Sequence, residues 1–430
     1  RQRDELREEW RTSKKYFLTV AVLFLLCFLV DLGIRLGNPD LWHPAKGGER
    51  PMNFSYFNAI LKSTTFPPYD PWFAGGYINY YYYGYVIAAT PVKLLGIVPA
   101  IAWNLLLPSL YAMMAMCAFS IGWNLGHRGE REGRGKWYSF LLEPQFLAGF
   151  AAAAAMVLLG NLGIVRLFYQ AFQRLGAPGG LISDGDIFQR LVWAGRGFLQ
   201  TLGGTHLPIG RGDWYWFPHL VIPAPLDVEP ITEFPLFTFI YSDMHAHNWA
   251  MPVQLLAQAW MLSLLLGRAR WRTSLDLVVG FLFGGLVIGA LYPVNLSDIY
   301  TYLPLAFVTL AYTLWRYADP AAVPWLKKLP DQWARLLLVL GGITALTVLS
   351  FVLYQPYREW YAQAYSQVGL WKGTRTPISL STLIAAAALS SLLAATASKS
   401  KRGWRARSSR KARKDTTPSS YSQVLGAGTT

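Results

Sequence analysis

Residues 16–35 read YFLTVAVLFLLCFLVDLGIR, an apolar run long enough for an α-helix to cross the hydrocarbon core of a bilayer, about 30 Å. Comparable runs lie at 100–124, 145–165, 249–266, 276–293, 302–316, 336–354 and 379–397. The composition agrees, because 53% of the 430 residues are hydrophobic and only 15% are charged, against about 25% charged in soluble proteins. The sequence therefore predicts an all-α polytopic membrane protein.

One further apolar segment, 82–98, is short and contains Pro91 and Lys93. Basic runs beside membrane spans mark cytoplasmic loops, and here they lie at 1–15, 127–136, 267–274 and 399–414. A crossing at 82–98 would place two of these runs on the side opposite the first. We therefore expect 82–98 to be a juxtamembrane or re-entrant segment, which leaves about eight spans. Both termini are then cytoplasmic, and the expected location is the cell (inner) membrane.

Three regions follow from this pattern. Residues 1–15 form a charged cytoplasmic lead-in, 16–398 the transmembrane domain, and 399–430 a basic cytoplasmic tail whose composition predicts disorder. The basic runs carry much of the net charge of +15 but lack an interleaved aromatic platform or a folded soluble domain, so we expect no nucleic-acid partner. Cys27 and Cys117 fall inside apolar spans, which excludes a disulfide framework. Because the chain begins with Arg, we expect a processed or shortened product.

The loops expected on the outer face, chiefly 36–99 and 166–248, hold most of the chemically active side chains. Only one of the six histidines, His127, lies in an expected cytoplasmic loop. The other five are His43, His206, His219, His245 and His247. This one-sided clustering indicates an extracytoplasmic site.

Residues 66–85 read FPPYDPWFAGGYINYYYYGY, an aromatic segment broken by glycine and proline. Tyrosine hydroxyl groups need partners when buried, so four consecutive tyrosines suit the boundary between lipid and water. We interpret this segment as a structured loop at the membrane surface. The substrate-binding residues predicted in the aromatic outer loops are Asn79, Tyr80, Tyr81, Tyr82, Trp214 and Trp216.

Asp243, His245 and His247 alternate in SDMHAHN, residues 242–248, just before an apolar span. In an extended segment the three side chains share a face, which suits a carboxylate–imidazole metal site. In a helix His245 would leave the face that the other two share. The alternative interpretation is therefore a polar cluster that caps the next helix. The cofactor that the alternation predicts is a divalent metal ion, Mg²⁺, Mn²⁺ or Zn²⁺.

Two carboxylates in the first outer loop, Glu49 and Asp70, are the predicted catalytic residues. A carboxylate at the membrane surface would act as general base toward an acceptor hydroxyl, or help to hold a divalent cation. The alternative is a pair of solvated loop acids. Asp70 stands before Pro71 and so also fits a turn.

Arginines and polar residues near the ends of the spans complete the candidate site. Arg35 and Arg358 would hold a lipid-linked phosphate by paired hydrogen bonds, or extend to lipid headgroups. Asn295 and Asp298, in NLSD between two spans, would line the site or satisfy helix ends.

Three long motifs resemble the bacterial and archaeal YYY membrane-protein family, over about residues 16–378. They are GNPDLWHPAKGGERPMNF at 37–54, the tyrosine segment at 66–85, and EFPLFTFIYSDMHAHNWAMP at 233–252. The family is similar in layout to the GT-C glycosyltransferases, which take a sugar from a polyprenyl-phosphate carrier. The resemblance implies a GT-C-like helix bundle and places Glu49 where those enzymes keep an acidic catalytic residue. The family usually has an acidic residue in its PMDF motif; Asn53 stands there in this chain, and we predict that it contacts substrate.

The predicted function is transfer of a sugar from a polyprenyl-phosphate donor to an acceptor on the extracytoplasmic face. The expected partners are membrane lipids, that donor and other membrane subunits. A non-catalytic structural or assembly subunit of a larger membrane complex is the alternative, favoured by Asn53 and by the short chain. A transporter is the third hypothesis, and the scarcity of intramembrane charges speaks against it.

Overall fold

The structure, a computed structural model, describes residues 2–37, 48–127, 139–159, 163–183, 185–210, 212–219, 233–267, 271, 273–362 and 370. Within these residues the regular elements are all helices, and the only β-bridge is an isolated one between Tyr69 and Tyr77. The all-α prediction is confirmed. Apart from Leu370, the described residues belong to one compact unit.

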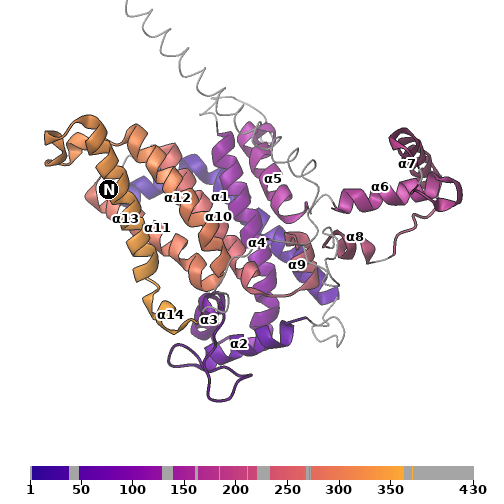
Figure 1. Cartoon of the computed structure of the whole chain (residues 1–430), viewed down its shortest axis with the longest axis horizontal. Coiled ribbons are helices and arrows are strands. Elements are labelled where there is room, and N and C mark those ends of the chain that lie inside the picture. Colours follow the sequence, from indigo (N-terminus) through magenta and orange to yellow (C-terminus); the bar gives the residue numbers. More distant parts are fainter. Residues whose placement is uncertain are drawn as a thin grey trace, which may run out of the picture. The chain divides into compact units, whose positions relative to one another are not determined.

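Five helices are long and apolar enough to cross a membrane, which confirms the polytopic class (Figure 1). They are α1 (Gln2–Gly37), α4 (Pro99–Gly126), α10 (Ala246–Gly267), α11 (Ser274–Val294) and α13 (Asp331–Val352). In α1 the candidate span begins at Trp10, so the predicted charged lead-in continues into the same helix.

Three of the eight predicted spans differ from the structure or lie beyond it. The span expected at 145–165 is α5 (Pro144–Val157), whose 14 residues rise about 21 Å and do not cross about 30 Å of hydrocarbon. Gly160 and Asn161, which follow in the sequence, have poor helix propensity. The span expected at 302–316 forms as the longer helix α12 (Leu296–Tyr317), which is not one of the five candidate membrane spans. The span expected at 379–397 and the tail at 399–430 lie outside the described residues.

Shorter helices connect the long ones. The α-helices among them are α2 (Arg50–Lys62), α3 (Tyr83–Leu95), α6 (Gly163–Gly176), α7 (Ile187–Leu202), α8 (Asp213–Trp216), α9 (Pro235–Tyr241) and α14 (Gln355–Trp360). The 3₁₀ turns are η1 (Ser139–Leu142), η2 (Pro178–Gly180), η3 (Phe217–His219), η4 (Pro320–Ala322) and η5 (Leu326–Lys328). Proline stands in the first turn of α2, α4, α5, α9 and α14, where its missing N–H costs nothing. Helix α3, at 13 residues, is too short to span, which agrees with a juxtamembrane segment.

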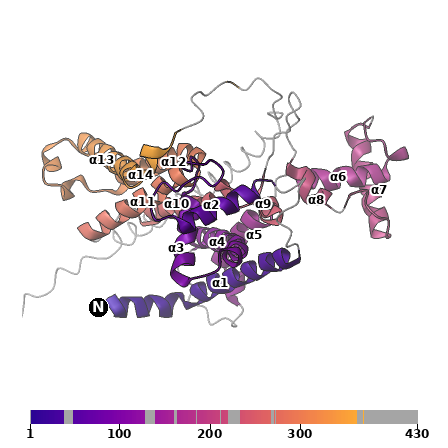
Figure 2. The ribbon, with the colours of Figure 1, turned by 90° about the horizontal axis from the view of Figure 1, so that it is seen from below.

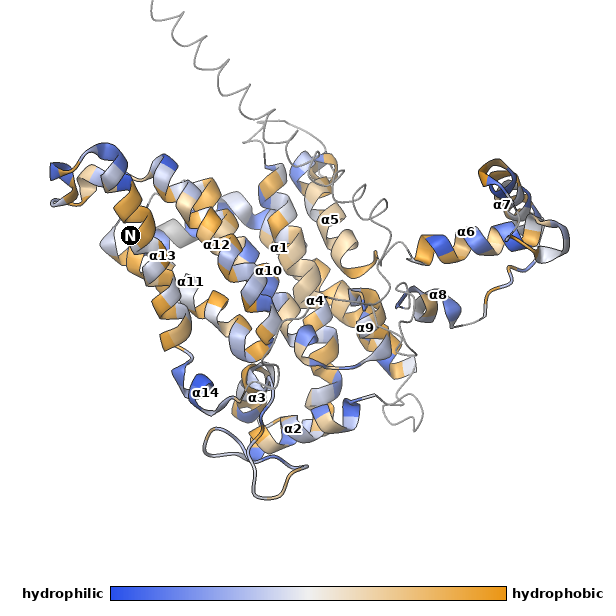
Figure 3. Ribbon diagram, viewed as in Figure 1, coloured by the Kyte–Doolittle hydropathy of each residue, from blue (hydrophilic) through white to orange (hydrophobic). Residues whose placement is uncertain are grey.

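The long helices consist largely of hydrophobic residues (Figure 3) and pack against one another. Helix α4 packs against α1, α5 and α10, and α10 against α11 and α12, with α13 covering α11 and α12. Helices α2 and α3 pack together, and α14 approaches them through Tyr357, which contacts Tyr82 (Figure 2). A Cβ on Gly84 of α3 would lie 2.4 Å from the Cβ of Trp249 on α10, so this crossing needs glycine. These contacts bring the loops before α2, α3 and α10 together.

Candidate functional site

The imidazole of His245 lies between two carboxylates, just before the N-terminus of α10. Its Nε2 atom is 2.9 Å from Oε2 of Glu49, and its Nδ1 atom is 3.5 Å from Oδ2 of Asp243. Glu49 is the N-cap residue of α2, and Asp243 and His245 lie between α9 and α10. Gly48, at φ +56°, makes the turn before Glu49, and a Cβ there would lie 3.3 Å from Oδ2 of Asp243. A glycine turn therefore brings the N-terminal end of α2 against the third motif.

A second histidine–carboxylate contact lies beside the first. Nε2 of His247 and Oε2 of Glu233 are 2.9 Å apart, an ion-pair contact outside hydrogen-bonding alignment. The hydroxyl of Thr238 donates to the same Glu233 oxygen at 2.9 Å. The rings of His245 and His247 are 5.6 Å apart and nearly parallel. We call Glu49, Glu233, Asp243, His245 and His247 the histidine–carboxylate cluster.

Contacts within the cluster shift the pKa values of His245, Glu49 and Glu233 toward their charged forms. Burial alone would lower the pKa of His245, but Asp243 and Glu49 together raise it to about 10. The hydrogen bond and charge of His245 hold the pKa of Glu49 below its usual value, against a smaller opposing effect of burial. Burial would likewise raise the pKa of Glu233, and the contacts with His247 and Thr238 lower it instead. Glu49 is the accessible member, since its side chain is 51% exposed and that of Asp243 only 10%.

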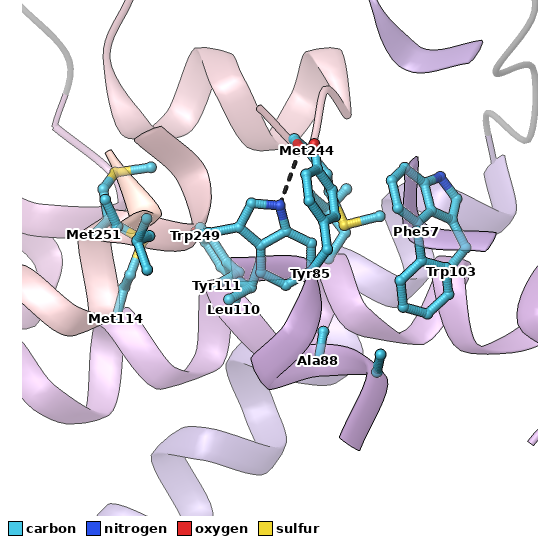
Figure 4. Packing of buried hydrophobic residues seen from close by; sticks show 14 of the residues in the cluster. Phe57, Tyr85, Ala88, Trp103, Leu110, Tyr111, Met114, Met244, Trp249 and Met251 are labelled. Atoms are coloured by element: carbon cyan, nitrogen blue, oxygen red, sulfur yellow. Dashed lines mark hydrogen bonds between the residues drawn. The ribbon is translucent and has the colours of Figure 1, made fainter. Parts of the chain in front are cut away.

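On its buried side, Asp243 is held by a network of hydrogen bonds. The amide nitrogen of Asn53 donates to its Oδ1 at 2.9 Å, and the Tyr85 hydroxyl donates to the Asn53 amide oxygen at 2.7 Å. The Tyr85 oxygen also lies 3.0 Å from the carbonyl of Met244, which accepts from the indole of Trp249 at 3.1 Å (Figure 4). We expected Asn53 to contact substrate. The structure buries it fully and uses both ends of its amide within the chain, so it positions Asp243.

Of the three tyrosines predicted to bind substrate, Tyr80 lies beside the cluster. Its ring is 6.4 Å from the ring of His245. Burial, followed by the negative charges of Glu49 and Asp243, raises its pKa and keeps the phenol neutral. The ring of Tyr81 packs at a tilt against those of Tyr80 and Tyr361, and Tyr82 is 4% exposed and packs against Tyr357. The run therefore forms an aromatic wall of which one end faces the cluster.

Several predicted site residues make contacts elsewhere. Oδ1 of Asp70 accepts from the backbone nitrogen of Trp72 at 2.8 Å, which is the turn that its neighbour Pro71 indicated. Asn79 exchanges two hydrogen bonds with the backbone of Ala362, at 2.9 and 3.0 Å. These two residues order the loops around the tyrosine wall.

The remaining polar and aromatic candidates also lie within structural contacts. Asn295 and Gln254 both donate to Asp298, at 3.0 and 2.7 Å, which joins α12 to α10. The guanidinium of Arg358 lies 5.7 Å from the ring of Phe351. Trp216 packs 4.4 Å from the ring of His219, and Trp214 is 38% exposed.

Arg35 and Asp31 are two ionisable residues one turn apart on α1. Asp31 was not among the residues predicted from the sequence. Both are buried, at 5% and 1% exposed, although most of this span is exposed on the surface of the chain. Arg35 donates to Asn104 of α4 at 2.9 Å. Arg50, the first residue of α2, is also buried, and its guanidinium lies 4.8 Å from the ring of Tyr241. An acidic residue inside an apolar run is rare and often functional, and this pattern would have identified Asp31 in the sequence.

The metal prediction for Asp243, His245 and His247 stays a prediction. The three carboxylates and two imidazoles of the cluster have suitable donor chemistry. In the described part of the chain, however, no group of three or more His, Cys, Asp or Glu side chains is arranged to hold one ion. The imidazole nitrogens face carboxylates instead, so no step below depends on a metal.

The fold and site define a polytopic all-α membrane protein with a histidine–carboxylate cluster where its loops converge. The chain belongs to the family described as uncharacterized membrane protein (DUF2298), whose model matches residues 1–425. Comparison with curated proteins and comparison with solved structures each gave no match. The family match and the five apolar helices agree that this is an integral membrane protein.

Proposed function

We propose that the protein transfers a glycosyl group from a polyprenyl-phosphate donor to an acceptor hydroxyl on the extracytoplasmic face, within a GT-C-like helix bundle. One observation carries the proposal: Glu49 is a half-exposed carboxylate held by a charged histidine at the start of α2, beside Tyr80. Asp243 and Asn53 hold that histidine from the buried side. A carboxylate fixed in this way is a preorganised proton acceptor at a membrane surface.

The reaction forms a bond between the acceptor oxygen and the anomeric carbon of the sugar. The bond from that carbon to the phosphate oxygen breaks, and polyprenyl phosphate leaves with the bonding electrons. The acceptor proton passes to the carboxylate of Glu49. A carboxylate of lowered pKa is sufficient, because the acceptor O–H becomes strongly acidic as its oxygen bonds to carbon.

Arg35 and Arg50 are the cations that we assign to the donor phosphate. Arg35 lies in the last turn of α1 and Arg50 at the start of α2, both side chains are buried, and guanidinium matches phosphate through paired hydrogen bonds. Arg35 lies in the last turn of a candidate membrane span, near the level of the lipid headgroups where a lipid-linked phosphate would lie. Tyr80 would stack on the transferred sugar.

The test is release of polyprenyl phosphate from a panel of polyprenyl-phosphate hexoses by the full chain in proteoliposomes. Glu49→Gln keeps the shape and removes the proton acceptor, so we expect a loss of about 10²–10⁴-fold in turnover. Asp70→Asn is the matched control and should keep its activity, because Asp70 supports a turn. Equal turnover by Glu49→Gln and wild type would refute the mechanism. A stoichiometric membrane complex without bound prenyl lipid would favour the subunit alternative.

A further inference from the structure

Helices α6 and α7 form a tightly packed hairpin that is too short to cross a membrane. Their 14 and 16 residues rise about 21 and 24 Å. A Cβ on Gly176 would lie 2.0 Å from the carbonyl oxygen of Trp193, and one on Gly197 would lie 2.0 Å from that of Phe172, so the two backbones touch. Asp186 caps α7 in a reciprocal arrangement with Gln189.

One side of α7 is both apolar and exposed. Helix α7 contacts α6 on the side of Gly197, whereas seven of its large apolar side chains are exposed. These are Ile187, Phe188, Leu191, Val192, Phe198, Leu199 and Leu202, each at least 50% exposed. At about 100° per residue they fall within an arc of about 140°. Val165 of α6, 62% exposed, adds to the apolar surface of the hairpin, and Figure 3 shows both apolar and polar residues on these helices.

The two helices of the hairpin carry only positive charge, and the segment between them in the sequence contains Asp184 and Asp186. Helices α6 and α7 contain four arginines and no acidic residue. Arg190 is used within the hairpin, where it donates to the carbonyls of Gly185 and Ser183 at 2.8 and 3.2 Å. Arg166, Arg174 and Arg196 are exposed. A short helix with an apolar face and a basic flank has the composition of an interfacial helix on an anionic membrane.

We propose that the α6–α7 hairpin is a membrane-interface anchor that lies on an anionic lipid surface. The apolar face of α7 enters the boundary between headgroups and acyl chains, and the three exposed arginines reach lipid phosphates from its edges. Charge complementarity selects this occupant, since the two helices hold three exposed arginines and no acidic residue, and the carboxylate of the neighbouring Asp186 is occupied in capping α7. The inference is independent of the proposed reaction.

The experiment measures the environment of three positions on α7 in the full chain. A nitroxide label is attached through Val192→Cys, Leu199→Cys or Gln200→Cys after both native cysteines are replaced by alanine. The protein is reconstituted in vesicles of equal parts phosphatidylglycerol and phosphatidylcholine. Labels at Val192 and Leu199 should collide preferentially with oxygen, which concentrates in lipid. The control label at Gln200, next to Leu199 but on the polar side, should collide preferentially with a water-soluble nickel chelate.

Charge reversal tests the lipid specificity. Arg196→Glu together with Arg174→Glu should shift the Leu199 label toward the nickel chelate in vesicles with phosphatidylglycerol, and less in pure phosphatidylcholine. The proposal is overturned if the labels at Val192 and Leu199 are as accessible to the nickel chelate as the label at Gln200. It is also overturned if they are shielded from both probes, because a protein surface or a second copy would then cover the face.

Discussion

Replacing His245 by glutamine removes the positive charge that Glu49 and Asp243 share. Glutamine retains a hydrogen-bond donor at nearly the same place, so the substitution isolates the charge from the shape. In wild type the pKa of His245 is raised from 6.5 to about 10 by its two carboxylates. The stabilisation from this charge should therefore be fully present below 6.5 and disappear as pH rises toward 10.

The magnitude follows from the difference between the two pKa values. A rise from 6.5 to about 10, at about 1.36 kcal/mol for each pKa unit, corresponds to ~5 kcal/mol. Water screens the exposed half of Glu49, so we expect ~2 kcal/mol in the measurement. Glu49 has the opposite sign: its lowered pKa stabilises the fold above 4.5, and this contribution is lost as the pH falls. Both contributions are therefore largest between 4.5 and 6.5.

The assay is denaturant unfolding of the full chain in detergent micelles, repeated across the pH range from 5 to 10 and followed by tryptophan fluorescence. His245→Gln should be less stable than wild type at low pH, with the difference closing as the pH approaches 10. His206→Gln, at an exposed histidine, is the control and should run parallel to wild type. If His245→Gln differs from wild type by a constant amount at every pH, the charged cluster is not what stabilises these loops.

Three further predictions concern the support of the cluster. Tyr85→Phe leaves the fully buried oxygen of Asn53 without its donor and should cost about 1–3 kcal/mol of unfolding free energy; no change would mean that the network does not hold Asn53. Gly84→Ala pushes a methyl group into Trp249 and should lower the thermal midpoint through a cost of about 1–3 kcal/mol. Gly33→Ala, with open space around it, should not lower it. If a divalent metal binds the histidine–carboxylate cluster it must displace a proton from an imidazole of raised pKa, so calorimetry should show affinity rising with pH toward 10; pH-independent binding would place the metal elsewhere.

Much of the fold is local information and was predictable. Most of the long apolar runs form helices long enough to span, because a run of about 20 apolar residues matches the thickness of the hydrocarbon core. The prediction failed in detail at 145–165, where the helix ends at Val157 instead of running on to residue 165. Hydropathy averages over such an end, whereas helix continuation depends on each backbone hydrogen bond.

The candidate site was only partly predictable. Asp243, His245 and His247 lie close in sequence, so their shared place was evident from the motif. Glu233 was not identified, although it lies in the same motif, because no sequence pattern predicts its contact with His247. Glu49 and Asp70 are alike in a sequence. One pairs with His245 and the other accepts a backbone hydrogen bond in a turn.

An all-α membrane protein, with most of its histidines outside the apolar runs, could be predicted from the residues alone. The contact of Glu49 with His245, the burial of Asn53 against Asp243 and the exposure of the apolar face of α7 came only from the packing of the helices. The physical reason is the range of the interactions. Hydropathy and helix propensity act along neighbouring residues, whereas ion pairs and buried amides depend on distances between loops that only helix packing sets.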